Sequence, residues 1–186
     1  MKNKRFAIVL DTDRCIDCKA CTVACKAENN VPLGPDNYRN WVVTGKLRGK
    51  YPNLGQSYLP SQCQHCSNAP CEHVCPTKAT TINPDGIVHV DDAKCIGCKY
   101  CQTACPYNAR YYNEETEAID KCTFCTQRIY AVPSQLPACV ETCPTKVRAF
   151  GDLNDPESEV SLLLARNPSK VLKPALGTNP HLFYLD

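Results

Sequence analysis

The residues best suited to chemistry in this 186-residue chain are sixteen cysteines, which fall into four groups of four with none left over. Two groups have the spacing C-x2-C-x2-C-x3-C, and the other two widen only the middle gap, to four and to thirteen residues. In chain order the groups are Cys15, Cys18, Cys21 and Cys25; Cys63, Cys66, Cys71 and Cys75; Cys95, Cys98, Cys101 and Cys105; and Cys122, Cys125, Cys139 and Cys143.

This spacing is typical of cubane cluster ligation. Three thiolates in a tight loop can bind one [4Fe–4S] cluster, and in two-cluster ferredoxins the fourth cysteine of the run binds the other cluster. Sixteen thiolates at four per cluster therefore predict four [4Fe–4S] clusters in two pairs. Proline follows the last cysteine of three groups, at Pro76, Pro106 and Pro144, and predicts a sharp turn after the ligand because its φ is restricted.

Disulfides and structural zinc are the alternatives. Disulfide scaffolds are usually short secreted chains, and the apolar stretch at Phe6–Leu10 is too short for a secretory signal. Zinc sites usually pair two C-x2-C hooks across a longer gap, whereas each group here has four thiolates of its own. Iron–sulfur ligation is the favoured interpretation, and the other two stay open.

Composition and charge narrow the function further. Aromatic residues make up only 8% of the chain, so we expect a thin apolar core that the clusters stabilise, and an apo-protein that is unfolded or molten. No apolar run is long enough for a membrane helix. Cations beside the ligands would offset the cluster charge, and they are too scattered for a nucleic-acid site. They are Arg14, Lys19, Lys26, Lys78, Lys94, Lys99, Lys121 and Lys146.

The intervening segments predict an α+β fold, a duplicated ferredoxin-like plan with loop-rich insertions and an extended C-terminal tail. Strands are expected at 6–10, 87–90 and 147–152, with a hairpin turn at 83–86. A helix is expected from Pro156 to about Arg166, with Asp155 as its N-cap. Residues 26–62 and 126–138 are expected to be irregular. The aromatic residues of 26–62 are expected to cover the clusters, and docking on a partner is the alternative. The tail should dock on its own body or on a partner.

No set of side chains suggests substrate chemistry, so no catalytic residue is predicted. His65 and His73 lie inside the second cysteine group, where either could hydrogen-bond a cluster sulfur and tune its potential. Every cysteine is used by a cluster in this interpretation, which indicates an electron carrier and not an enzyme.

Longer stretches resemble a known family. They include Cys15-Ile-Asp-Cys-Lys-Ala-Cys-Thr-Val-Ala-Cys-Lys, Lys121-Cys-Thr-Phe-Cys, Pro137-Ala-Cys-Val-Glu-Thr-Cys-Pro-Thr and Phe150-Gly-Asp-Leu-Asn-Asp-Pro-Glu-Ser. The chain is similar to the four-cluster iron–sulfur subunits of molybdopterin-dependent oxidoreductases, and within these to the polysulfide and thiosulfate reductase type.

The resemblance implies a ligand pattern and a domain division. Groups one and four would form one module, residues 1–56 plus 108–155. Groups two and three would form an inserted module, residues 57–107, and a helix and docking tail would follow at 156–186. The implied ligand sets are cluster one, Cys15, Cys18, Cys21 and Cys143; cluster two, Cys63, Cys66, Cys71 and Cys105; cluster three, Cys75, Cys95, Cys98 and Cys101; and cluster four, Cys25, Cys122, Cys125 and Cys139.

The resemblance also implies partners. An electron-transfer subunit of this kind would connect an integral membrane quinol-binding subunit to a molybdopterin-containing catalytic subunit. The complex would reduce a sulfur compound such as polysulfide, thiosulfate or tetrathionate. It would be membrane-associated, at the outer face by co-export with the catalytic subunit, or alternatively cytoplasmic. A formate dehydrogenase or hydrogenase complex, or a free polyferredoxin, are the alternative settings.

Overall fold

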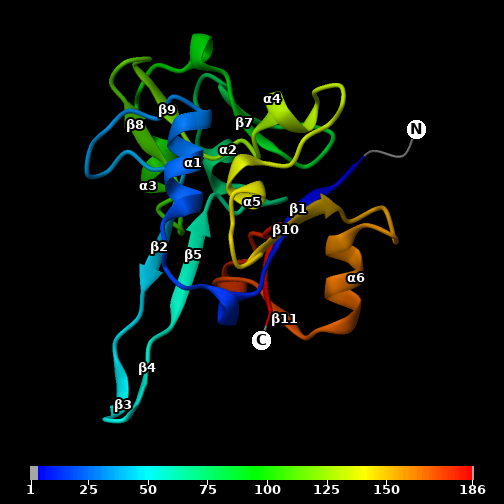
Figure 1. Ribbon diagram of the computed structural model, residues 1–186. Coiled ribbons are helices and arrows are strands. Elements are labelled where there is room, and N and C mark those ends of the chain that lie inside the picture. The colour runs from blue at the N-terminus through cyan, green and yellow to red at the C-terminus, as the bar shows by residue number, and fades with distance from the viewer. Residues whose placement is uncertain (1–3, 186) are drawn as a thin grey trace.

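A small four-stranded sheet joins the two ends of the chain in the computed structural model, which describes residues 4–185. Its strand order is β10-β1-β12-β11. Helix α6 (Glu159–Arg166) packs against β1 and β10, as Figure 1 shows. The strands are β1 (Phe6–Leu10), β10 (Arg148–Asp152), β11 (Ser169–Lys170) and β12 (Leu182–Leu185).

The C-terminal tail docks on the body of this chain. Strand β12 runs parallel to β1, with Ile8 opposite Leu182, and β1 pairs with β10 on its other side. All five residues of β1 are buried because both faces of the sheet are covered: Ile8 packs in the main apolar core, and Val9 packs with Val160 of α6. The Tyr184 ring is fully buried, and its hydroxyl donates a hydrogen bond to the Pro60 carbonyl at 3.1 Å.

A long hairpin and the short helices at the first and fourth cysteine groups lie beside this sheet. Strands β2 and β5 pair at the base of the hairpin, and β3 and β4 pair at its tip, which extends away from the body in Figure 1. Helix α1 packs beside α5. The elements are η1 (Thr12–Arg14), α1 (Ala20–Glu28), β2 (Asn40–Thr44), β3 (Arg48–Lys50), β4 (Asn53–Gly55), β5 (Tyr58–Gln62), α4 (Thr126–Ile129) and α5 (Ala138–Glu141).

The central part of the chain contains two small hairpins and two one-turn helices. The hairpin β6–β7 turns at 83–86 as predicted, with Gly86 at a φ of 77°. The elements are α2 (Pro70–His73), β6 (Thr80–Ile82), β7 (Val88–Val90), η2 (Asp92–Lys94), α3 (Tyr100–Thr103), β8 (Tyr111–Asn113) and β9 (Ala118–Asp120), and η3 (Pro174–Leu176) lies in the tail. No helix among residues 4–185 is both long and apolar enough to span a bilayer.

Three predictions about elements are wrong in part. Helix α6 begins at Glu159 with Ser158 as its N-cap, because the Asp155 carboxylate instead accepts a hydrogen bond from the Glu157 N–H in a preceding turn. Residues 26–62 are irregular only in part: 29–39 contain no helix or strand, whereas 40–62 form the long hairpin. Residues 126–138 begin with helix α4, and a loop follows it.

The aromatic residues of the long hairpin have different surroundings. Trp41 packs against the main apolar core, as covering the clusters would require. Tyr51 at the hairpin tip is 89% exposed and covers nothing in this chain.

Two elements form contacts across the predicted module boundaries. Strand β5 lies within 57–107 but pairs with β2 of the first module. Hairpin β8–β9 lies after residue 108, yet Ile119 packs in an apolar cluster with Cys66 and Cys101 of the second. These contacts bring the two halves of the molecule into one continuous body.

Candidate iron–sulfur sites

The structure brings the sixteen cysteines together in four sets, each drawn from two sequence groups. Three sets each line a small cavity: Cys15, Cys18, Cys21 and Cys143 (set one); Cys75, Cys95, Cys98 and Cys101 (set three); and Cys25, Cys122, Cys125 and Cys139 (set four). The remaining set, called set two, consists of Cys63, Cys66, Cys71 and Cys105, and in it Cys66 interacts electrostatically with the other three. These are the combinations that the resemblance implies, whereas ligation itself stays a prediction.

The donor sets fit a cubane better than a single ion. The sixteen thiols are free of disulfides. Ligands of one tetrahedral zinc ion would bring their sulfur atoms within about 4 Å of one another. No group of three or more His, Cys, Asp or Glu side chains among residues 4–185 meets the requirements of such a site. Four thiols around one shared space are the donor chemistry that a [4Fe–4S] cluster requires.

A left-handed residue precedes the second cysteine in all four groups. The residues are Asp17, His65, Gly97 and Phe124, with φ of 57°, 44°, 65° and 55°. This conformation is uncommon outside glycine, and turns that contain it can direct successive backbone N–H groups toward an anion. The Phe124 N–H accordingly donates to Cys122 Sγ at 3.4 Å. Only Gly97 carried a sequence signal for this turn.

The turns predicted after the prolines are confirmed. Lys78, Asn108 and Lys146 lie three residues after their cysteines, adopt φ of 53–56° and donate backbone hydrogen bonds to the carbonyls of Cys75, Cys105 and Cys143. The polypeptide then reverses, and the Val147 N–H donates to Cys143 Sγ at 3.3 Å. The turn after Cys143 therefore holds its buried thiol against the backbone.

Burial differs strongly among the sets. Only Cys18 of set one and Cys98 of set three are exposed, whereas all four cysteines of set four are buried. Burial and the nearby Cys139 thiol raise the pKa of Cys25 to about 12. Burial and the Cys63 thiol likewise raise the pKa of Cys66 to about 12. These thiols must lose protons to bind metal, so cluster binding is coupled to proton release.

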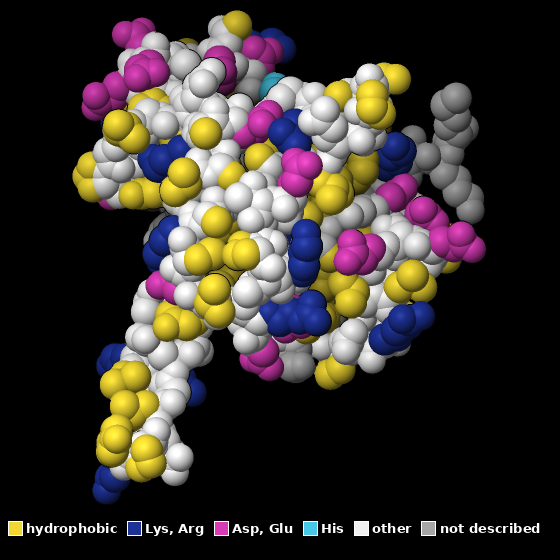
Figure 2. All heavy atoms as spheres, viewed as in Figure 1, with side chains coloured by type: hydrophobic (Ala, Val, Ile, Leu, Met, Phe, Trp, Pro, Cys, Tyr) yellow, Lys and Arg dark blue, Asp and Glu magenta, His cyan; other side chains and the backbone are white. Residues whose placement is uncertain are grey.

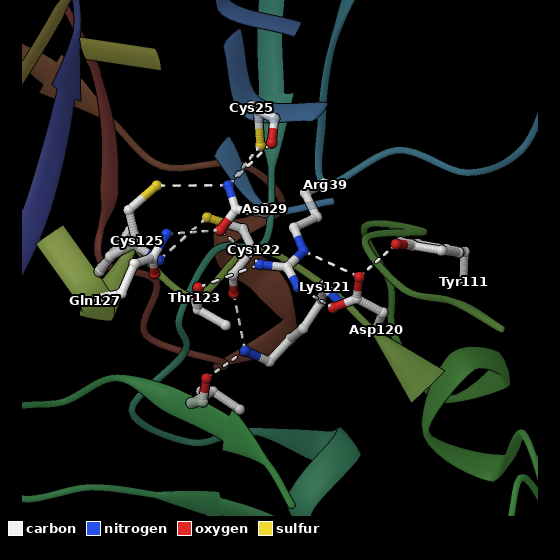
Figure 3. Close-up of polar contacts among 12 residues, drawn as sticks. Cys25, Asn29, Arg39, Tyr111, Asp120, Lys121, Cys122, Thr123, Cys125 and Gln127 are labelled. Carbon is white, nitrogen blue, oxygen red and sulfur yellow. Dashed lines mark hydrogen bonds and ion pairs between the residues drawn. The ribbon is translucent and has the colours of Figure 1, made fainter. Parts of the chain in front are cut away.

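Side-chain donors approach the sulfur atoms. Asn29 Nδ2 lies 3.7 Å from both Cys25 Sγ and Cys125 Sγ, and Figure 3 shows it between the two thiols. Gln62 Nε2 donates to Cys122 Sγ at 3.6 Å, and Arg110 Nη2 donates to Cys71 Sγ at 2.9 Å. Hydrogen bonds to sulfur are among the means by which a protein tunes cluster potential.

Among the eight cations that the sequence places beside the ligands, only Lys121 is buried. Two further buried cations, Arg110 and Arg148, were missed by the sequence reasoning. A signal for them exists, because each is the fifth residue after the last cysteine of its group, in a Cys-Pro-x-x-x-Arg repeat.

The two histidines of the second group differ in environment. His73 is exposed at the end of α2. His65 is fully buried, accepts a hydrogen bond from the Val88 N–H at 3.1 Å and stacks on Phe124 with ring centroids 3.7 Å apart. Burial and the Lys121 charge lower the pKa of His65 well below its ordinary value, so the ring stays neutral. The stacked pair joins the loop of Cys63 and Cys66 to the loop of Cys122 and Cys125.

Comparisons with known proteins agree with this donor set. Two models of the 4Fe-4S dicluster domain match the chain, at residues 14–79 and 54–153. A subunit of the tetrathionate reductase of Salmonella typhimurium is 47% identical over 97% of this chain and 72% of the relative. A component of the polysulfide reductase of Wolinella succinogenes is 43% identical, with 97% and 93% covered. The iron-sulfur subunit of a putative dimethyl sulfoxide reductase of Halobacterium salinarum is 40% identical, with 97% and 79% covered.

These matches confirm the sequence resemblance at the level of the family, and they favour iron–sulfur ligation over zinc. The ferredoxin-like, mixed α+β fold is confirmed as well, since the short helices and small sheets belong to two dicluster domains. The protein therefore belongs to the 4Fe-4S dicluster family of iron–sulfur electron-transfer subunits, and its sixteen cysteines correspond to four [4Fe–4S] clusters.

Proposed function

We propose that this chain relays single electrons along four cluster sites between two partner subunits. The observation that carries the proposal is the distribution of exposure: the only exposed cysteines are Cys18 and Cys98, in sets one and three, while set four is fully buried. A path with its ends at the surface and its middle shielded from water suits a relay. When bound, a [4Fe–4S] cluster supplies reversible one-electron chemistry.

The protein's own part is to hold and insulate the sites. We propose that each set holds one cluster: cluster one at Cys15, Cys18, Cys21 and Cys143; cluster two at Cys63, Cys66, Cys71 and Cys105; cluster three at Cys75, Cys95, Cys98 and Cys101; and cluster four at Cys25, Cys122, Cys125 and Cys139. Sets one and four would define the first module, and sets two and three the inserted one. The strand pairings favour moving β5 to the first module and β8–β9 to the second.

We propose a molybdopterin-containing catalytic subunit as the partner at set one. The hairpin tip supports a protein partner on this side, because its strands β3 and β4 are exposed throughout and an isolated two-stranded hairpin is marginally stable in water. Leu47, Tyr51 and Leu54 are exposed there, and Figure 2 shows hydrophobic and basic side chains along the hairpin. A surface cavity lies between Cys15 and the hairpin residues Arg48 and Gly55.

An integral membrane quinol-binding subunit would then dock at set three. Exposed apolar side chains surround Cys98 at that end, including Ile96 and Tyr100. The complex would be membrane-associated at the outer face, with the cytoplasm as the alternative. Its terminal reaction would be reduction of a sulfur compound, since relatives are named as parts of tetrathionate and polysulfide reductases.

Co-purification from the native source tests this function. Isolated anaerobically, the chain should accompany a molybdenum-containing subunit. Its potentials should fall between those of quinol and a sulfur-compound acceptor. Recovery of a monomer without molybdenum would favour a free polyferredoxin. A formate- or hydrogen-oxidising partner would contradict the reductase assignment.

A further inference from the structure

Three cations lie in the interior without a carboxylate partner. Arg110, Lys121 and Arg148 are 5%, 1% and 4% exposed, and none forms an ion pair with Asp or Glu in the part of the chain that the structure describes. Burying an unpaired charge is costly. The acidic groups around these three are thiols of the cluster sets, which would bind a cluster as thiolates, so the cations are placed for negatively charged clusters.

Arg148 lies between set one and set four. Its Nη2 is 3.9 Å from Cys21 Sγ of set one, and its Nη1 donates to Gln62 Oε1 at 2.5 Å. The Gln62 amide in turn donates to Cys122 Sγ of set four at 3.6 Å. One guanidinium and one amide therefore form a continuous hydrogen-bonded link from one set to the other.

Arg110 lies between set two and set three. Its Nη2 donates to Cys71 Sγ of set two at 2.9 Å. Burial raises the pKa of the Cys101 thiol of set three, and the charge of the same guanidinium opposes that rise. Arg110 and Arg148 are each the fifth residue after the last cysteine of a group. Each half of the chain thus places an arginine in the equivalent position, between its own two cysteine sets.

Lys121 lies between set four and set two. Its ammonium group donates hydrogen bonds to the backbone carbonyl of Cys122, at 2.9 Å, and to that of Val88. Figure 3 shows Lys121 beside Cys122. It interacts electrostatically with Cys63 and Cys71 of set two and with Cys122 of set four. The stacked His65 and Phe124 rings bring the two loops together at this point.

We propose that Arg148, Lys121 and Arg110 are positioning residues that occupy the three gaps of a single path running from set one to four, two and three. This proposal rests on the proposed function. Clusters held in the four sets would supply the one-electron transfers, and the three residues would supply positive charge between neighbouring sets. A cation in the gap would stabilise the added negative charge on either side, so it would raise both neighbouring potentials together and leave the difference between them nearly unchanged.

The test is a redox titration, followed by electron paramagnetic resonance, of the cluster-loaded full chain. Lys121→Met removes the charge and keeps most of the side-chain volume. In this variant, two of the four reduction potentials should fall by at least about 59 mV. For a one-electron couple this equals a tenfold change in the ratio of reduced to oxidised cluster at a fixed ambient potential. Lys94→Met is the matched control, because Lys94 likewise precedes the first cysteine of its group but has a side chain 63% exposed. It should shift no potential by that amount.

The order of the four sets along the path can be identified from the signals that two variants both shift, without prior assignment of each signal to a set. Arg148→Met and Lys121→Met should share one shifted signal, and Lys121→Met and Arg110→Met should share another. Arg148→Met and Arg110→Met should share none. A shared signal in that last pair, a variant that shifts all four signals, or one that shifts none would overturn the proposal.

Charge-retaining variants keep the test decisive if a methionine variant loses clusters. Lys121→Arg, Arg110→Lys and Arg148→Lys alter packing but keep the charge, so their potentials should stay close to those of the parent chain. If a potential in these variants shifts enough to change the ratio of reduced to oxidised cluster tenfold, then packing and not charge sets the potentials. The measurement needs no partner subunit, so absence of a molybdenum partner would refute the proposed function and leave this result standing.

Discussion

Protonation of His181 should loosen the C-terminal tail in mild acid. The imidazole is 1% exposed, and its Nε2 accepts a hydrogen bond from Arg5 Nε at 3.1 Å and lies 2.8 Å from Ser67 Oγ. Because Nε2 acts as an acceptor, the folded state requires the neutral ring. Burial, together with the Arg5 charge, lowers the pKa of His181 to about 4.

The direction follows from proton linkage. The unfolded histidine has a pKa of about 6.5, so between pH 6.5 and pH 4 the open state binds more protons than the folded one. The free energy that holds the tail therefore decreases as the pH falls through this window. Between pH 7 and pH 5 the two pKa values correspond to a loss of about 2 kcal/mol.

The weaker binding of the tail would affect the second cysteine group. The tail backbone accepts hydrogen bonds from the Ser67 N–H at Asn179, 2.9 Å, and from the Asn68 N–H at Thr178, 3.1 Å, directly after Cys66. Hydrogen exchange of the β12 amides in the cluster-loaded chain measures tail opening. After correction for intrinsic exchange rates, their protection should fall about 20-fold from pH 7 to pH 5.

Two variants decide whether His181 is the responsible group. His181→Gln cannot gain a proton and should abolish most of the pH dependence. His89→Gln removes an exposed histidine and should leave it unchanged. If His181→Gln loses protection in acid as steeply as the parent chain, the linkage argument fails.

Three further results are expected. Complete iron removal should abolish the cooperative thermal transition in calorimetry, because the clusters take the place of much of the core; a retained transition would contradict this. Leu182→Ala, at a fully buried residue of β12, should lower the free energy of unfolding measured in urea by about 2–5 kcal/mol. Leu162→Ala, at a residue 40% exposed, should lower it much less. Equal losses in the two variants would contradict the packing of β12. Replacing residues 47–56 by a two-glycine turn should leave the iron content, measured by elemental analysis, near sixteen atoms per chain, because the hairpin tip supplies no cysteine. A lower iron content would show that the tip supports a cluster site.

Local signals predicted much of the fold. The apolar run at Phe6–Leu10, the turn at 83–86 and the turns after Cys-Pro are set by side chains a few residues apart, and all are found. The start of α6 was misjudged because Asp155 can accept hydrogen bonds either as an N-cap or within a separate turn, and local sequence does not distinguish these uses.

The long hairpin was missed because its pairing is non-local. Strands β2 and β5 are joined through an exposed tip rich in glycine and proline, residues that usually indicate irregular structure. The Cys-Pro-x-x-x-Arg repeat singles out Arg110 and Arg148 but does not by itself show that they are buried. Burial of Lys121 had no local signal, since Lys94 and Lys121 both precede the first cysteine of a group and only Lys121 is buried.

Cysteine spacing by itself favoured four [4Fe–4S] clusters over zinc and disulfides, because each group of four supplies the thiolates that one cubane needs. The ferredoxin-like plan followed from the apolar stretches that alternate with the cysteine groups. Tertiary structure decided which thiols share a space, which sets reach the surface and which cations lie between them. These properties depend on how distant segments pack against one another, and the free energy of a buried charge depends on all of its neighbours and not on its position in the chain.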